Sequence, residues 1–198
     1  TEMTPPAQLA DKATDGSISR ALNGGRFNSK SGEILEFPTP AGMKANRLLL
    51  VGTGEDSLDT MDARTIGGKL GAALGKLDKA GAHIFADGFG DDALMAQLAL
   101  GLRMRRYTFA KYKSEPDTKS DAGPGDIIIA LADTANVRKT DNATNALAEG
   151  IALTRDLVNE PANVLYPESY TERLEALSEL GLTIEVLDEK QMQDLGMN

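Results

Sequence analysis

The segment TRDLVNEPANVLYP, residues 154–167, determines how the chain is divided. A helical pattern over Asp141–Asn159 ends within it, because Pro161 lacks a backbone N–H and biases Glu160 away from helical geometry. Pro167 suits the first turn of a second helix. The segment therefore predicts an interdomain elbow. The elbow residues are Asn159, Glu160, Pro161 and Asn163.

The sequence after the elbow predicts the start of a second domain. The helix that begins at Pro167 is ended by Gly181, Thr183–Leu187 alternates like a strand, and Asp188 caps a short helix over Glu189–Leu195. A whole domain usually needs about 100–200 residues. We therefore expect a truncated second domain, left by trimming, by proteolysis or by division of the protein into two chains.

From Arg47 to Ala132 the sequence alternates strands and helices, which is typical of an α/β layered fold with largely parallel neighbouring strands. The predicted strands are Glu33–Pro38, Arg47–Gly52, Ala82–Ala86 and Asp126–Ala132. The predicted helices are Ile18–Leu22, Asp59–Lys79 and Asp91–Arg106. We expect Thr1–Asp15 to be loosely held or to lean on a neighbour, and Lys111–Gly125 to be an exposed loop.

Three glycines, Gly67, Gly71 and Gly75, recur every fourth residue within the helix predicted over Asp59–Lys79. Each glycine costs about 1 kcal/mol relative to alanine in a helix interior. Because glycine has no Cβ, this cost is explained if this face of the helix lies close to another backbone of the same fold.

Composition and charge exclude several classes of protein. The chain has 198 residues, a formal net charge of -9 and a pI near 4.7. Nucleic-acid binding needs clustered Lys and Arg, so a DNA-binding regulator is disfavoured, and the basic run Arg103–Arg106 is interpreted as a solvated helix end. Cysteine is absent, and no apolar stretch approaches the roughly 20 residues that cross a bilayer. We expect a soluble, cytoplasmic protein without a membrane partner.

Two glycine-rich turns are weak candidates for an anion site. Gly52 and Gly54 follow one predicted strand and Gly88 and Gly90 another, and both turns precede helices, where backbone N–H groups can hold a phosphate. Neither turn has dinucleotide spacing or a Walker lysine, so tight strand-to-helix turns are the favoured interpretation. His83, the only histidine, is interpreted as a structural or surface residue. The sequence identifies no catalytic, metal-binding or cofactor-binding residue.

The residues around the elbow resemble one enzyme family. RDLVNEPANVL at 155–165, with VLDE at 186–189 and LGM at 195–197, resembles the entry to the catalytic domain of leucyl aminopeptidases, the cytosol-type dinuclear metallo-aminopeptidases. Residues 27–32, 48–52 and 112–114 resemble the N-terminal domain of that family more loosely. The resemblance covers essentially the whole chain.

This resemblance implies an α/β fold. It implies a three-layer, macro-domain-like mixed sheet with helices on both faces, followed by a linker helix and a truncated α-β-α start. The expected parts are an N-terminal macro-like domain over 1–140, the linker helix and elbow over 141–163, and the first elements of the peptidase domain over 164–198.

The resemblance also implies a function. The full-length enzyme is expected to be a homohexamer that removes N-terminal residues from peptides with two divalent metals, Zn or Mn, in its own C-terminal catalytic domain. The family's ligand motifs, Asp-Thr-Gly-Gly and Asn-Ala-Glu-Gly-Arg, do not occur in this sequence. We therefore expect this chain to hold no metal, to be inactive alone, and to contribute to oligomer assembly and active-site access. The alternative is a self-contained macro-like domain that binds an ADP-ribose-like or other anionic ligand at the Gly52 and Gly88 turns.

Overall fold

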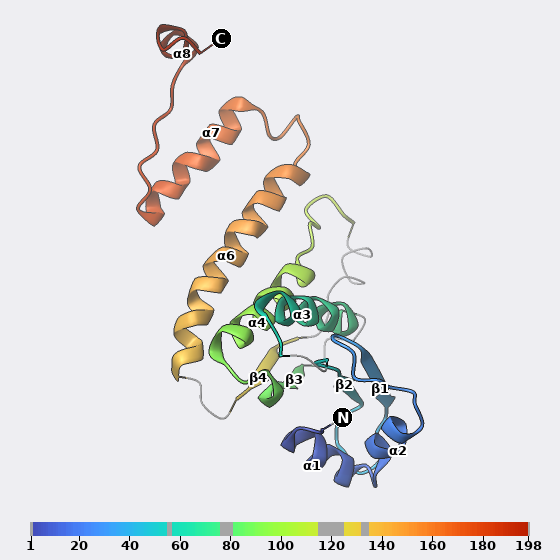
Figure 1. Ribbon diagram of the computed structural model, residues 1–198. Helices are drawn as coiled ribbons and strands as arrows, with labels where there is room; N and C mark the ends of the chain where they lie inside the picture. The colour runs from blue at the N-terminus through green and yellow to red at the C-terminus, as the bar shows by residue number, and fades with distance from the viewer. Residues whose placement is uncertain (1, 55–56, 76–80, 115–124, 132–134, 198) are drawn as a thin grey trace. The chain divides into compact units, whose positions relative to one another are not determined.

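The computed structural model describes residues 2–54, 57–75, 81–114, 125–131 and 135–197, and divides the chain into two compact units (Figure 1). The first unit is Thr1–Ala152 and the second is Leu153–Asn198. The first unit contains α1 (Pro5–Ala13), α2 (Ser17–Asn23), β1 (Ile34–Pro38), β2 (Arg47–Val51), α3 (Thr60–Leu74), β3 (Ala82–Phe85), η1 (Asp87–Phe89), α4 (Asp92–Arg106) and β4 (Ile127–Ala130). Helix α6 (Ala135–Asn159) crosses the boundary between the units.

The described strands form two small sheets. In the alternating part of the chain, β3 and β4 pair in parallel, with Ala82 opposite Ile127, as the sequence predicts. Strands β1 and β2 pair antiparallel, with Ile34 opposite Val51. Only residues 39–46 connect β1 to β2, and so short a connection permits a hairpin, whereas a parallel pair needs a crossover of a dozen or more residues. The fold is therefore mixed α/β.

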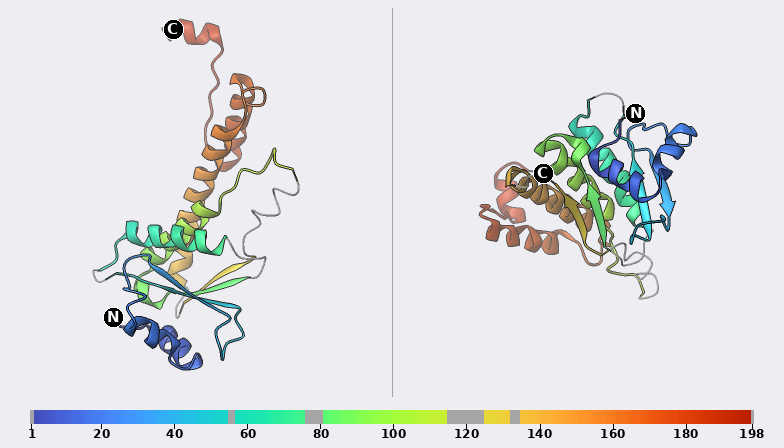
Figure 2. Two further views of the ribbon diagram at one scale, coloured as in Figure 1. Left: turned by 90° about the vertical axis from the view of Figure 1, so that its right-hand side faces the viewer. Right: turned by 90° about the horizontal axis from the view of Figure 1, so that it is seen from below.

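Helices α3 and α4 form the layer against which both sheets pack. Ile66 and Leu98 are completely buried between them, and apolar side chains of all four strands pack against the same cluster. Both helices begin on a capping carboxylate: Asp59 accepts a hydrogen bond from the Asp62 N–H, and Asp91 accepts one from the Leu94 N–H. Figure 2 shows α1 on the opposite side of the strands from α3.

The backbones of α3 and α4 touch at glycines. A Cβ added at Gly67 would lie 2.1 Å from the Leu98 carbonyl oxygen, and one added at Gly101 would lie 2.0 Å from that of Arg64. Beside this contact, the Arg64 guanidinium donates twice to Gln97 Oε1, at 2.9 and 2.6 Å. The expected close approach is confirmed at Gly67, where the neighbour is the backbone of α4, and at Gly71, whose nearest neighbour is the Arg105 side chain, but not at Gly75, where only atoms of α3 itself lie near.

At the two ends of the chain, one expectation is confirmed and one is wrong. Residues 2–15 lean on a neighbour: they include α1, with Pro5 in its first turn, where a missing N–H is tolerated, and Asp11 accepts hydrogen bonds from the N–H and hydroxyl of Ser19 in α2. Thr183–Leu187 is not a strand. A strand needs a neighbour to satisfy its backbone groups, and none of the strands in the described part of the chain pairs with it.

The remaining element boundaries differ little from the expected ones. Helix α6 begins at Ala135, six residues before the expected Asp141. Helix α3 ends at Leu74, and residues 76–80 of its predicted C-terminal part lie outside the described residues, as does most of the predicted loop, at 115–124. The second unit contains α7 (Pro167–Glu175), η2 (Ala176–Leu180) and α8 (Glu189–Asp194). Gly181 and Asp188 cap η2 and α8 as expected.

Gly101→Ala is expected to destabilise the first unit by about 1–3 kcal/mol, because its Cβ has to displace the backbone of α3. Gly68→Ala is the matched control: the nearest atom to its Cβ is 4.0 Å away, so this change is expected to stabilise by roughly 0.4–1 kcal/mol. Urea unfolding followed by circular dichroism measures both. Equal effects of the two substitutions would contradict a backbone contact at Gly101.

Candidate functional site

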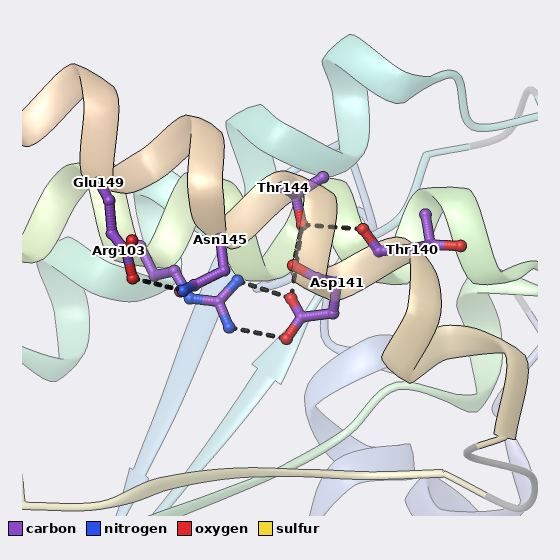
Figure 3. A network of polar contacts seen from close by, with 6 residues as sticks. All are labelled: Arg103, Thr140, Asp141, Thr144, Asn145 and Glu149. Carbon is purple, nitrogen blue, oxygen red and sulfur yellow. Dashed lines mark hydrogen bonds and ion pairs between the residues drawn. The ribbon is translucent and has the colours of Figure 1, made fainter. Parts of the chain in front are cut away.

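An arginine–carboxylate pair fixes α6 to α4 within the first unit (Figure 3). Arg103, in the last turn of α4, donates through both terminal nitrogens to the two Asp141 carboxylate oxygens, at 2.6 and 2.8 Å. The largely buried Thr144 hydroxyl donates to the Asp141 carbonyl oxygen at 3.0 Å, and Asn145 donates to Glu149 at 2.7 Å on the same helix. The pair therefore connects two residues that are 38 positions apart in the sequence.

The two partners stabilise each other's charged form. Hydrogen bonding from Arg103 lowers the pKa of Asp141 below its ordinary value, although partial burial acts in the opposite direction. Hydrogen bonding to Asp141 raises the pKa of Arg103. The solvated-helix-end interpretation fits Arg105 and Arg106, which are exposed, whereas Arg103 is only partly exposed and is paired with Asp141. No local spacing links Arg103 to Asp141, so the sequence carried no signal for the pair.

The predicted elbow residues lie together at the end of α6, inside the second unit. Asn159 is the last residue of the helix, and its side-chain amide donates to the Arg155 carbonyl oxygen at 2.8 Å. The Pro161 carbonyl oxygen accepts from the N–H groups of Val164 and Leu165, both at 2.9 Å, which closes the turn. Pro161 and Asn163 are exposed.

Glu160 differs from the other elbow residues because its side chain is buried. Its carboxylate is 3% exposed and accepts a hydrogen bond from Arg173 of α7 at 3.2 Å. Ser169 connects the same two segments, since its hydroxyl donates to the Val164 carbonyl oxygen at 2.8 Å and accepts from the Tyr166 N–H at 3.0 Å. The elbow is therefore a hydrogen-bonded turn, to which the sequence pointed without indicating Arg173 or Ser169.

The Gly52 turn is joined to the neighbouring loop by its own backbone. The Gly52 N–H donates to Glu33 and the Gly54 N–H to Ser29, both at 2.9 Å, and a Cβ at Gly52 would lie 2.4 Å from the Lys30 carbonyl oxygen. Close backbone contact explains the glycine at position 52. Gly54 has a φ of +91°, which favours glycine.

At the second turn, Gly88 lies in η1, and Gly90, with a φ of +74°, separates η1 from α4. The Asp91 carboxylate already occupies the N-terminus of α4. Anion binding at either turn stays an untested prediction. His83 lies exposed on β3, paired with Ile128.

The described residues do not match a metal centre. They contain no group of three or more His, Cys, Asp or Glu side chains that could hold a metal ion. A divalent-metal hydrolase site needs several converging ligands and a second shell that orients them. The part of the chain that the structure describes therefore does not fit the two metals that the resemblance implies for the full enzyme. None of its helices is long and apolar enough to cross a bilayer.

Lowering the pH is expected to weaken the contribution of Asp141 to stability. Its folded pKa is lowered, so the contribution is complete above about pH 4, the pKa of an unperturbed Asp, and is lost as the pH falls through the folded value. Asp141→Asn is expected to destabilise by roughly 0.5–1 kcal/mol at pH 7, typical of an exposed pair. The difference in free energy of unfolding between Asp141→Asn and the wild type, measured by urea unfolding, should become smaller as the pH is lowered.

The exposed Asp126→Asn provides the matched control for this titration, because it removes the same charge from the same unit. Its difference from the wild type is expected to be small at every pH. The free energies of unfolding of Asp141→Asn and the wild type are compared from pH 7 down to the lowest pH at which both are folded. If their difference stayed constant over this range, the ion pair would contribute nothing to stability.

The structure resembles a solved leucine aminopeptidase and a solved bottromycin maturation enzyme. It superimposes on a mutant of tomato leucine aminopeptidase with a TM-score of 0.77 and 23% sequence identity, covering 97% of this chain and 39% of that chain, which shows the fold. It also matches the bottromycin maturation enzyme BotP in complex with Mn, with a TM-score of 0.69 and 26% identity, over 91% of this chain and 37% of that one.

Curated sequences give the same assignment. A probable cytosol aminopeptidase of Rhodopseudomonas palustris (strain BisA53) is 39% identical over 186 residues, and one of Dinoroseobacter shibae is 38% identical over 196 residues. These matches cover 91% and 98% of this chain but only 37% and 38% of the relatives, so the chain spans less than two fifths of their length.

Two family models match separate parts of the chain. The model of the N-terminal domain of the cytosol aminopeptidase family matches residues 1–116, and the model of the catalytic domain of that family matches residues 152–198. The second match begins where the second structural unit begins, next to Leu153. The chain therefore belongs to the cytosol aminopeptidase family, a family of metallo-hydrolases, and contains its N-terminal domain and the start of its catalytic domain.

Proposed function

We propose that this chain is the non-catalytic N-terminal portion of an aminopeptidase that removes N-terminal amino acids from peptides. The observation that carries the proposal is the pair of family matches, in which the N-terminal domain precedes the beginning of the catalytic domain, as expected. The relatives named as probable cytosol aminopeptidases support peptides as the substrate and the cytoplasm as the location of the whole enzyme.

The chemistry of the whole enzyme would reside outside the described residues. Two divalent metals, manganese or zinc, are proposed for it, and the solved complex of BotP with Mn supports manganese. A divalent metal supplies a nucleophilic water at neutral pH by lowering its pKa. Because the described residues offer no ligand group, no step of the reaction is assigned to them.

The contribution proposed for this chain is structural. Its parts would be a macro-like three-layer domain over 1–140, a linker helix and elbow over 141–163, and the first peptidase elements over 164–198. The Arg103–Asp141 pair supports the linker role, because it fixes the first half of α6 to the N-terminal domain. Assembly into a homohexamer and control of access to the active site complete the proposal. The alternative of an ADP-ribose-binding domain gains no support from the relatives, which are peptidases.

The 198-residue chain is expected to hydrolyse no leucine amide at any concentration of Mn²⁺ or Zn²⁺, because the described residues contain no metal-ligand group. Release of ammonia from leucine amide, followed with the purified chain, measures this. The full-length Dinoroseobacter shibae relative, assayed in parallel, shows that the conditions permit turnover. Chelator-sensitive hydrolysis by the chain, absent from a mock preparation of the same host, would overturn the assignment of a non-catalytic role.

A further inference from the structure

We propose that Glu160 is a positioning residue that locks the angle between the last turns of α6 and helix α7. The proposal rests on the burial of the Glu160 side chain, which is 3% exposed, and on its hydrogen bond from Arg173 at 3.2 Å. Apolar residues near it are less completely shielded: Val158 is 80% exposed, whereas Leu157, Val164 and Leu165 are half-buried.

Burial of a carboxylate requires a specific reason, because an ionised group loses its hydration and must regain equivalent interactions. The acidic residues of α7, Glu168, Glu172 and Glu175, are all exposed and keep their hydration. The burial of Glu160 therefore follows from its position in the elbow and not from the number of acidic residues in this region.

The partner of Glu160 shows what the buried carboxylate does. Arg173, the single basic residue in the sequence of α7, lies 13 positions further along and about two turns into that helix. Its Nη2 can reach Glu160 Oε1 only if α7 turns back from the elbow, as Figure 1 shows. The contact therefore holds one particular arrangement of the two helices.

The other elbow hydrogen bonds described above join residues that are closer in the sequence. The bonds of the Pro161 carbonyl and of Ser169 are short-range, spanning three to five residues, and define the turn itself. A buried polar pair has its best-attested use in selecting one geometry from several, and the Glu160–Arg173 contact joins the elbow to α7 across 13 residues.

The distance between α6 and α7 tests the lock directly. The chain contains no cysteine, so Val158→Cys and Glu175→Cys, both at exposed positions, introduce two spin labels cleanly. Pulsed electron paramagnetic resonance of this labelled background is expected to give one narrow distance distribution. Glu160→Ala and Arg173→Ala should each broaden it at least twofold, and Arg173→Lys, which keeps the cation, should restore most of the narrow component.

Glu168→Ala is the matched control, since it removes a carboxylate from the exposed side of α7. Its distribution is expected to equal that of the labelled background. If Glu160→Ala gave the same narrow distribution as Glu168→Ala, the lock would be refuted. A loss of helical circular dichroism in Glu160→Ala would also refute it, because it would show that Glu160 supports helix formation and not the angle between helices. These measurements do not involve peptidase activity, so they stand or fall separately from the proposed function.

Discussion

The backbone contact between α3 and α4 is the constraint on which the first unit depends. At Gly67 and Gly101 each helix presents bare backbone to the other, with no room for a Cβ. The close approach allows Ile66 and Leu98 to be completely buried between the helices. The apolar faces of both small sheets then pack against this helical layer. Because protein interiors are close-packed, a change at these glycines is felt by the strands of both sheets that pack against the two helices.

The second unit is held by polar contacts and not by a core. Its helices are defined by capping groups, such as Asp188 before α8, and by the Glu160–Arg173 pair at the elbow. Hydrogen bonds of this kind contribute about 0.5–1.5 kcal/mol each and rarely sustain a domain without apolar burial. This agrees with the extent of the family match, which covers 152–198 alone within the catalytic domain. The chain thus joins a unit with an apolar core to a short segment that is held mainly by polar contacts.

Much of the fold was accessible from the sequence because it is encoded locally. The helix predicted over Asp91–Arg106 corresponds to α4, and the glycine repeat identified, at Gly67, the face of α3 that approaches another backbone. Pro161 located the end of α6. These signals depend on neighbours within one or two turns, which a single sequence displays.

The errors arose where tertiary contacts decide the outcome. The alternation in Thr183–Leu187 indicates a strand, but a strand forms only beside a partner, which the described residues do not supply. The contacts of Asp11 with Ser19 and of Arg103 with Asp141 join residues too far apart in the sequence to leave a local signal. In the elbow, the sequence identified Glu160 but not its burial or its partner, because burial depends on how α7 returns.

Native-state hydrogen exchange of the 198-residue chain tests the central claim that the glycine-mediated contact of α3 and α4 sustains the first unit while the second lacks a core. Buried core amides exchange only through global unfolding, whereas weakly packed segments exchange through local opening. We expect the amides of α3 and α4 to exchange more slowly than any others in the chain, and those of residues 182–188 to be among the fastest to exchange. Protection in α7 and α8 equal to that in α3 and α4 would contradict it.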